Sequence, residues 1–165
     1  MKQRYARLAG MALLLTFSAT QVQAACPLEL AVYSDDSAGV SLDFRPGQTA
    51  VVTNSFKMAL SGDVLLDGVV MWTEGPARPV GLLMKDCPEG DVTGEEIAAC
   101  TAWEGSIYAA DDTGTIGLLP AQGEAAPHRL VFADLARGLA AGPISDTIDA
   151  DRLPSDVFTL SGCQE

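Results

Sequence analysis

The chain has 165 residues, with 22 acidic and 10 basic side chains and a formal net charge of −12 at pH 7. An acidic surface of this kind repels nucleic acid and anionic membranes, which argues against both as partners. The hydrophobic content of 48% is too high for a disordered chain, and the length suits one domain with a single core.

The N-terminus has the three-part layout of a secretory signal peptide. Three basic residues within the first seven positions precede the apolar run Leu8–Phe17, and Val22–Ala24 offers a cleavage site after Ala24. We therefore predict a cleaved signal peptide over residues 1–24 and an exported domain, periplasmic or secreted, over residues 25–165. No later apolar run is long enough for a membrane-spanning helix.

A lipoprotein is the competing interpretation of the N-terminus, because Cys26 follows the predicted cleavage site by two residues. A lipidated cysteine normally has an aliphatic residue three places before it, whereas this chain has Gln23. All four cysteines follow the signal, and an even number is typical of disulfides formed in an oxidising compartment. Lipidation of Cys26 would leave one of them unpaired.

Short apolar stretches separated by turn residues predict β-strands, several with period-two alternation. The predicted strands cover Leu28–Tyr33, Ser41–Arg45, Ser55–Ser61, Val64–Thr73, Val80–Met84, Ser106–Ala110, Thr115–Leu119, His128–Phe132 and Val157–Ser161. Asp67 and Gly68 interrupt the fourth stretch, which is either one bulged strand or a tight hairpin. The loop Asp111–Gly114 predicts a hairpin between the two strands that flank it.

Two short helices are predicted among the strands. The first runs from Gly94 to Trp103, because Thr93 and Glu96 form a capping-box pair just before an apolar run. The second covers Leu135–Ala141, with Asp134 as its cap and Gly142 and Pro143 at its end.

These elements indicate a mainly β domain, with α+β as the alternative class. We predict one antiparallel sandwich- or barrel-like domain with one or two short helices. Four cysteines allow three pairings. Cys87 and Cys100 flank a turn and a helix start, while Cys26 and Cys163 lie near the domain termini, which are often close in space. The predicted disulfides are therefore Cys26–Cys163 and Cys87–Cys100.

The segment before the first helix partly matches a calcium-binding loop. With Gly90 at the central position, Glu96 takes the final bidentate position. However, Lys85 and Cys87 then occupy the first two ligand positions, where carboxylates are needed. A capped helix inside a disulfide loop is the favoured interpretation.

Catalytic patterns are weak. His128 is the chain's single histidine, and there is no G-x-S-x-G motif. The acidic doublets Asp35–Asp36, Glu95–Glu96 and Asp111–Asp112 fit turn and cap positions better than a pair of catalytic carboxylates. Trp72 and Trp103 are expected in the core.

The sequence therefore predicts an exported, non-catalytic domain of the bacterial envelope that binds a protein or a small ligand. No catalytic, cofactor-binding or metal-binding residue is assigned. Two alternatives remain open at this point: a hydrolase that uses carboxylates brought together by folding, and a calcium-stabilised module.

Overall fold

Alternating apolar residues form nine β-strands in the computed structural model, which describes residues 25–47, 49, 51–73, 75 and 77–165. The predicted signal peptide, residues 1–24, lies outside the described residues. The strands are β1 (Ala31–Asp35), β2 (Val40–Pro46), β3 (Val52–Ala59), β4 (Leu65–Trp72), β5 (Pro79–Met84), β6 (Thr101–Ala110), β7 (Ile116–Leu118), β8 (Arg129–Phe132) and β9 (Val157–Cys163). The helices are α1 (Gly94–Cys100) and α2 (Leu135–Ala141), and short 3-10 turns lie at Leu28–Leu30, Ser145–Thr147 and Ala150–Arg152.

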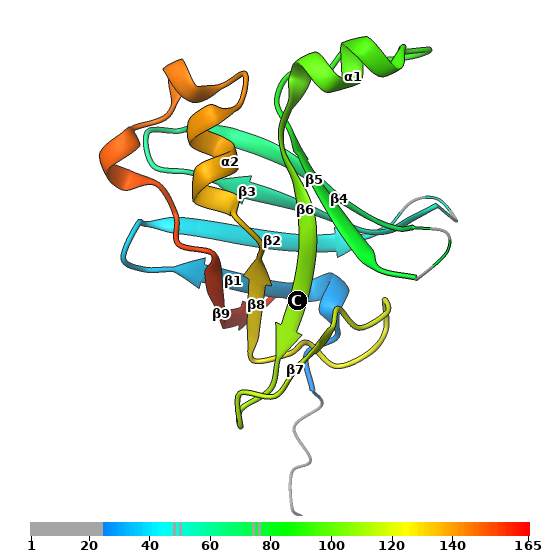
Figure 1. Cartoon of the computed structure of the whole chain (residues 1–165). Coiled ribbons are helices and arrows are strands. Elements are labelled where there is room, and N and C mark those ends of the chain that lie inside the picture. The colour runs from blue at the N-terminus through cyan, green and yellow to red at the C-terminus, as the bar shows by residue number, and fades with distance from the viewer. Residues whose placement is uncertain (1–24, 48, 50, 74, 76) are drawn as a thin grey trace, which may run out of the picture.

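Eight of these strands form a closed antiparallel barrel (Figure 1). The strands from β1 to β6 pair in sequence, β8 and β9 follow, and β9 pairs with β1 to close the ring. Strand β7 adds to the second half of β6 outside the ring. Helix α1 lies in the β5–β6 connection and α2 in the β8–β9 connection. The prediction of a mainly β, antiparallel, sandwich- or barrel-like domain is confirmed, and of the two architectures the barrel is the one found.

Aromatic side chains fill the interior of the barrel. Phe56 packs against Phe44 and Phe132, with ring centroids 5.1 and 5.8 Å apart, and Phe132 packs against Phe158 at 5.3 Å. Gly68 makes room for this cluster, because a Cβ at that position would lie 2.3 Å from a ring carbon of Phe56. Strand β4 continues through Gly68 from Leu65 to Trp72, so the predicted stretch is a single strand and not a hairpin.

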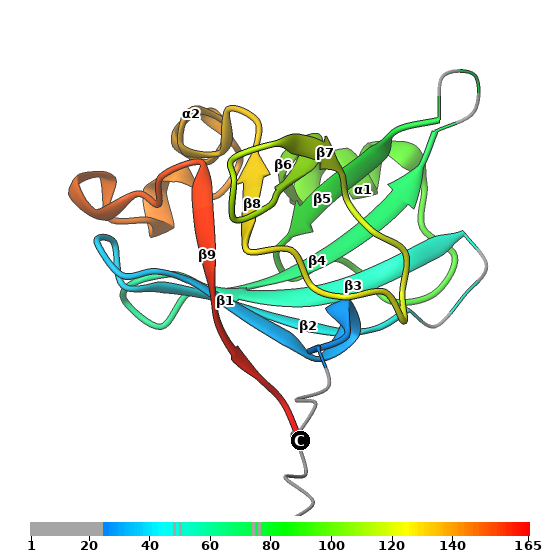
Figure 2. The same ribbon diagram turned by 90° about the horizontal axis from the view of Figure 1, so that it is seen from below.

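A disulfide joins the first and last segments of the barrel. Cys26 and Cys163 form a disulfide across 137 residues of sequence, and Cys87 and Cys100 form a second one across 13. Both predicted pairings are confirmed. Figures 1 and 2 show the C-terminus beside the start of the described chain. None of the helices in the described part of the chain has the length and apolar character needed to cross a lipid bilayer.

Several predicted boundaries are wrong; for example, β3 begins at Val52 rather than Ser55, and β6 at Thr101 rather than Ser106. Residues Leu28–Leu30 form a 3-10 turn, so β1 begins at Ala31. Helix α1 ends at Cys100, and Trp103 lies in β6, because pairing with β5 extends to Thr101. At the start of β1 and at the end of α1, strand pairing in the barrel, rather than the local sequence pattern, sets the boundary.

Asp35 joins the β1–β2 turn to the segment before β9. Its carboxylate is buried and accepts hydrogen bonds from Ser37 Oγ at 2.5 Å, Ala38 N at 3.4 Å and Ser155 N at 2.7 Å. Burial by itself would raise the pKa of Asp35, but the hydrogen bonds outweigh it and the pKa lies below its usual value. The ionised carboxylate therefore stabilises the folded barrel.

Removal of the terminal disulfide should destabilise the protein more than removal of the local one. The loop-entropy relation gives upper values of about 5 kcal/mol for the long loop and about 3 kcal/mol for the short one. Thermal unfolding followed by circular dichroism should thus show a lower Tm for Cys26→Ser/Cys163→Ser than for Cys87→Ser/Cys100→Ser. The reverse order would contradict this account of the barrel's closure.

Substitution of Asp35 should lower the free energy of unfolding by an amount that depends on pH. Because the folded pKa lies below the unfolded value of about 3.9, the stabilisation is present above that pH and is lost as pH falls through the folded pKa. Asp35→Asn should lower the free energy of unfolding in urea by about 1–3 kcal/mol at neutral pH. The difference from wild type should shrink in acid, and the exposed neighbour variant Asp36→Asn should show little effect at either pH. A cost independent of pH would exclude this role for the carboxylate.

Candidate functional site

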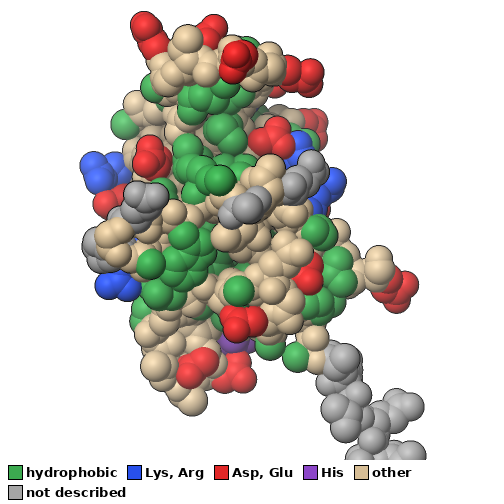
Figure 3. Space-filling view, turned by 90° about the vertical axis from the view of Figure 1, so that its right-hand side faces the viewer, with side chains coloured by type: hydrophobic (Ala, Val, Ile, Leu, Met, Phe, Trp, Pro, Cys, Tyr) green, Lys and Arg blue, Asp and Glu red, His purple; other side chains and the backbone are tan. Residues whose placement is uncertain are grey.

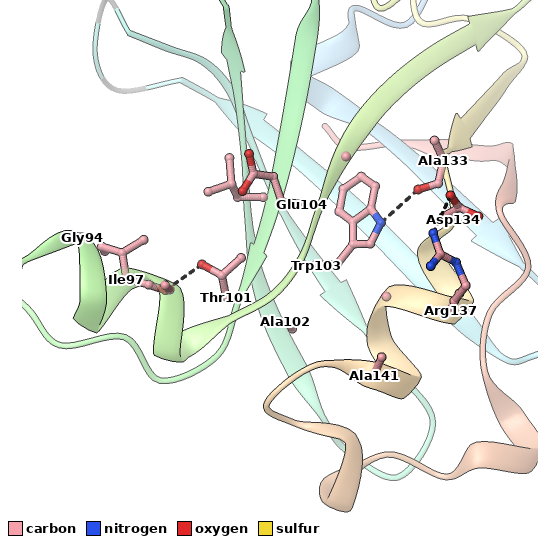
Figure 4. A pocket seen from close by; sticks show the side chains of 14 residues that line it. Gly94, Ile97, Thr101, Ala102, Trp103, Glu104, Ala133, Asp134, Arg137 and Ala141 are labelled. Atoms are coloured by element: carbon pink, nitrogen blue, oxygen red, sulfur yellow. Dashed lines mark hydrogen bonds and ion pairs between the residues drawn. The ribbon is translucent and has the colours of Figure 1, made fainter.

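A surface groove of about 650 Å³ lies between α1 and α2, over the first half of β6. We call it the α1–α2 groove. In Figure 4, Ile97 and Thr101 lie on the α1 side of β6, whereas Trp103 and Arg137 lie on the α2 side. A hollow of this volume is within the usual range for ligand sites in proteins.

The floor of the groove is a bulged part of β6. Leu83 of β5 pairs with Trp103, but the next residue, Met84, pairs with Thr101, so Ala102 has no residue opposite it. A bulge bends the strand and redirects the neighbouring side chains. As a result Ala102 and Trp103 are both buried although they are adjacent.

Trp103 lies in a slot between two glycines. A Cβ at Gly105 or at Gly138 would lie 2.5 Å from an atom of the indole ring. The indole Nε1 donates a hydrogen bond to the carbonyl oxygen of Ala133 at 3.1 Å, and the ring centroid lies 5.4 Å from that of Phe132. Trp103 is buried, as predicted, and its contacts make it a fixed part of the groove floor.

Helix α2 forms one wall, and Asp156 holds its first turn. The Oδ1 atom of Asp156 accepts hydrogen bonds from the backbone nitrogens of Leu135 and Ala136, at 2.9 and 3.4 Å. Asp134 precedes the helix in a left-handed conformation with φ 57° and makes no capping hydrogen bond. The prediction that the Asp134 side chain caps this helix is therefore wrong, because Asp156, at the end of the same β8–β9 connection, takes that position.

Helix α1 forms the other wall, and none of its seven residues is buried. The predicted capping box is present: Thr93 Oγ1 accepts from Glu96 N at 3.3 Å, and Thr93 N donates to Glu96 Oε2 at 2.8 Å. These contacts lower the pKa of the Glu96 carboxyl. A helix this short is not stable alone in water, so the cap and the Cys87–Cys100 disulfide hold this wall in place.

Most polar groups of the groove are engaged with one another. Arg137 Nη2 donates to Asp134 Oδ2 at 2.9 Å, and this hydrogen bond lowers the pKa of Asp134 and raises that of Arg137. Thr101 Oγ1 donates to the carbonyl oxygen of Ile97 at 2.7 Å. Glu104 is exposed and has no hydrogen-bond or ion-pair partner among the described residues.

The acidic doublets have the turn and cap roles that the sequence predicts. Asp35 accepts within the β1–β2 turn, Glu96 accepts in the capping box, and Asp111 Oδ1 accepts from the backbone nitrogens of Thr113 and Thr115, both at 2.9 Å. One carboxylate of each doublet is thus part of the fold.

The other residues singled out from the sequence lie apart from the groove floor. His128 Nδ1 lies 3.4 Å from Asp112 Oδ1 near the β6–β7 turn. Cys87 is bonded to Cys100, so its sulfur is not available at the second calcium-ligand position. Trp72, which was expected in the core, is 38% exposed at the end of β4.

Sequence reasoning missed the groove itself, since its walls come from two separate connections of the barrel. One local signal was present: Trp103 and Gly105 are two residues apart, which places them on one face of a strand. None of the protein-family models, curated proteins or solved structures compared with the chain matches it.

The capping role of Asp156 can be separated from the surface pair of Asp134. Asp156→Ala should remove both acceptor contacts and lower the free energy of unfolding by about 1–2 kcal/mol, the usual cost of losing a helix cap. Asp134→Asn keeps a residue that tolerates the left-handed backbone and removes only an exposed ion pair, so stability should change little. Urea unfolding of the two variants decides the matter, and an equal or larger loss for Asp134→Asn would contradict the assignment.

Proposed function

We propose that the protein is an exported, non-catalytic binding domain that holds a segment of a partner protein in the α1–α2 groove. The observation that carries this proposal is the make-up of the groove: an open hollow whose walls are small or aliphatic side chains and whose ion pair is already satisfied. The apolar and small contributors include Leu82, Gly94, Ile97, Ala98, Ala102 and Ala141. Surfaces of this kind receive the apolar face of a helix or an extended segment.

The rigidity of the walls supports binding. The floor belongs to the closed barrel, α2 is fastened by Asp156, and α1 by the disulfide Cys87–Cys100. A groove that is already ordered loses less conformational entropy when a partner binds. All four cysteines are paired, which is consistent with an oxidising compartment and with the export that the N-terminus predicts.

The alternative of a carboxylate hydrolase receives less support from the same groove. Two carboxylates line it, Glu104 and Asp134. A general acid needs a raised pKa, whereas the pKa of Asp134 is lowered by its hydrogen bond to Arg137. The Thr101 hydroxyl donates to a backbone carbonyl and is therefore not held toward a base.

The proposal is tested by filling the groove from one side. Ala98 and Ala99 are adjacent exposed residues of α1, but only Ala98 lines the groove, whereas Ala99 lines the hollow beside Pro143 and Ile144. Linear peptides selected on the wild-type protein from a random display library should bind Ala98→Trp at least about tenfold more weakly, a loss of about 1.4 kcal/mol. They should bind Ala99→Trp as they bind wild type.

Fluorescence anisotropy of the selected peptides provides the measurement, and the Tm of each variant shows that it is folded. Equal affinities for Ala98→Trp and Ala99→Trp would rule out the groove as the binding surface.

A further inference from the structure

The segment from Asp86 to Glu104, which contains α1, is strongly acidic. From position 86 to position 104 the chain has six acidic side chains and no basic one, and all six are exposed. They are Asp86, Glu89, Asp91, Glu95, Glu96 and Glu104. Figure 3 shows acidic side chains gathered at the upper end of the molecule, where α1 lies, with hydrophobic side chains below them.

Most of these carboxylates have no counter-charge in the fold. Asp86 pairs with Lys85, and Glu96 belongs to the capping box. The other four make no hydrogen bond or ion pair within the described residues; they are Glu89, Asp91, Glu95 and Glu104. We call these four the acidic lip. Arg137, the basic residue that lines the groove, is already paired with Asp134.

One residue of the acidic lip, Glu104, lines the groove, and the other three lie in and just before the first turn of α1. Ile97 of α1 and Leu82 of β5 both line the groove. On the barrel wall Leu82 pairs with Glu104 on one side and with Val69 of β4 on the other, so the aliphatic surface continues from the groove across two strands. The three side chains Leu82, Ile97 and Val69 are half-buried.

We propose that the partner segment bound in the α1–α2 groove is basic and amphipathic. Its aliphatic side chains lie on Leu82, Ile97 and Val69, and its lysine or arginine side chains meet the acidic lip. This inference rests on the proposed function and adds the charge of the partner. The four carboxylates of the acidic lip, one in the groove and three in and before the first turn of α1, attract a cationic segment and speed its approach. The same charges repel an acidic segment or an anionic lipid surface.

Three synthetic peptides test the charge of the partner. They share one amphipathic pattern of leucines and have lysine, glutamine or glutamate at the polar positions. Anisotropy with the exported, oxidised protein should show the lysine peptide binding at least about tenfold more tightly than the glutamine peptide, and the glutamate peptide binding most weakly. The preference for lysine should decrease when the ionic strength is raised from low salt to about 0.15 M.

Two variants with the same change in net charge separate the acidic lip from the overall charge of the protein. Glu89→Gln/Asp91→Asn/Glu95→Gln neutralises three lip residues. Asp36→Asn/Asp63→Asn/Glu165→Gln neutralises three exposed residues in the β1–β2 turn, the β3–β4 turn and the C-terminus. The first variant should bind the lysine peptide about tenfold more weakly than wild type, and the second less than about twofold more weakly.

The experiments distinguish a wrong charge preference from a wrong binding surface. If the glutamine peptide binds as tightly as the lysine peptide, or if the two triple variants weaken binding equally, the acidic lip does not select the partner. In that case Ala98→Trp would still block the peptides if the groove is the binding surface. If Ala98→Trp leaves the binding of every peptide unchanged, the proposed function falls and the inference falls with it.

Discussion

Pairing between β1 and β9 joins the first strand to the last and converts a row of antiparallel strands into a closed ring. Without it both strands would expose an unpaired edge, which proteins avoid. Several contacts between distant parts of the chain depend on this closure. Cys26 bonds to Cys163, and Gln164 Nε2 donates to the carbonyl oxygen of Phe44 at 2.7 Å. The hydroxyl of Tyr33 donates to the carbonyl oxygen of Pro127 at 2.9 Å. Burial raises the pKa of Tyr33, so this phenol stays a donor.

Because the interior of the barrel is filled, the α1–α2 groove lies on its outside. Aromatic rings centred on Phe132 occupy the space inside the ring of strands. Of the two connections that contain a helix, β5–β6 leads from α1 directly into β6, and β8–β9 places α2 against β6. The α1–α2 groove is therefore a consequence of strand order: α1 directly precedes β6, and α2 follows β8, which is a neighbour of β6 in the barrel.

The acidic residues of the protein divide into two groups with different physical roles. Asp35, Asp111 and Asp156 accept backbone hydrogen bonds that hold a turn or a helix start. Within the part of the chain that the structure describes, the side chains of Glu95 on α1 and Glu104 in the groove have no hydrogen-bond or ion-pair partner. A carboxylate that accepts hydrogen bonds stabilises the fold locally, whereas free carboxylates repel one another and are tolerated because water solvates them. The second group is thus available to a partner of opposite charge.

Local patterns in the sequence determined much of the fold. The capping box of Thr93 and Glu96, the extent of α2, the hairpin around Asp111–Gly114 and both disulfide pairings follow from neighbouring residues or from the chain ends. Alternation specified which face of each strand is buried, because successive side chains point to opposite faces.

Tertiary structure alone decided the remaining features, because each depends on residues far apart in the chain. Strand pairing with β5 ended α1 at Cys100 and placed Trp103 in a bulged strand. Asp156, rather than the adjacent Asp134, became the cap of α2. The groove needs walls from two connections that approach only when the barrel closes. Periodicity and capping patterns report on contacts within a few residues, so they carry no information about which distant segments share a surface.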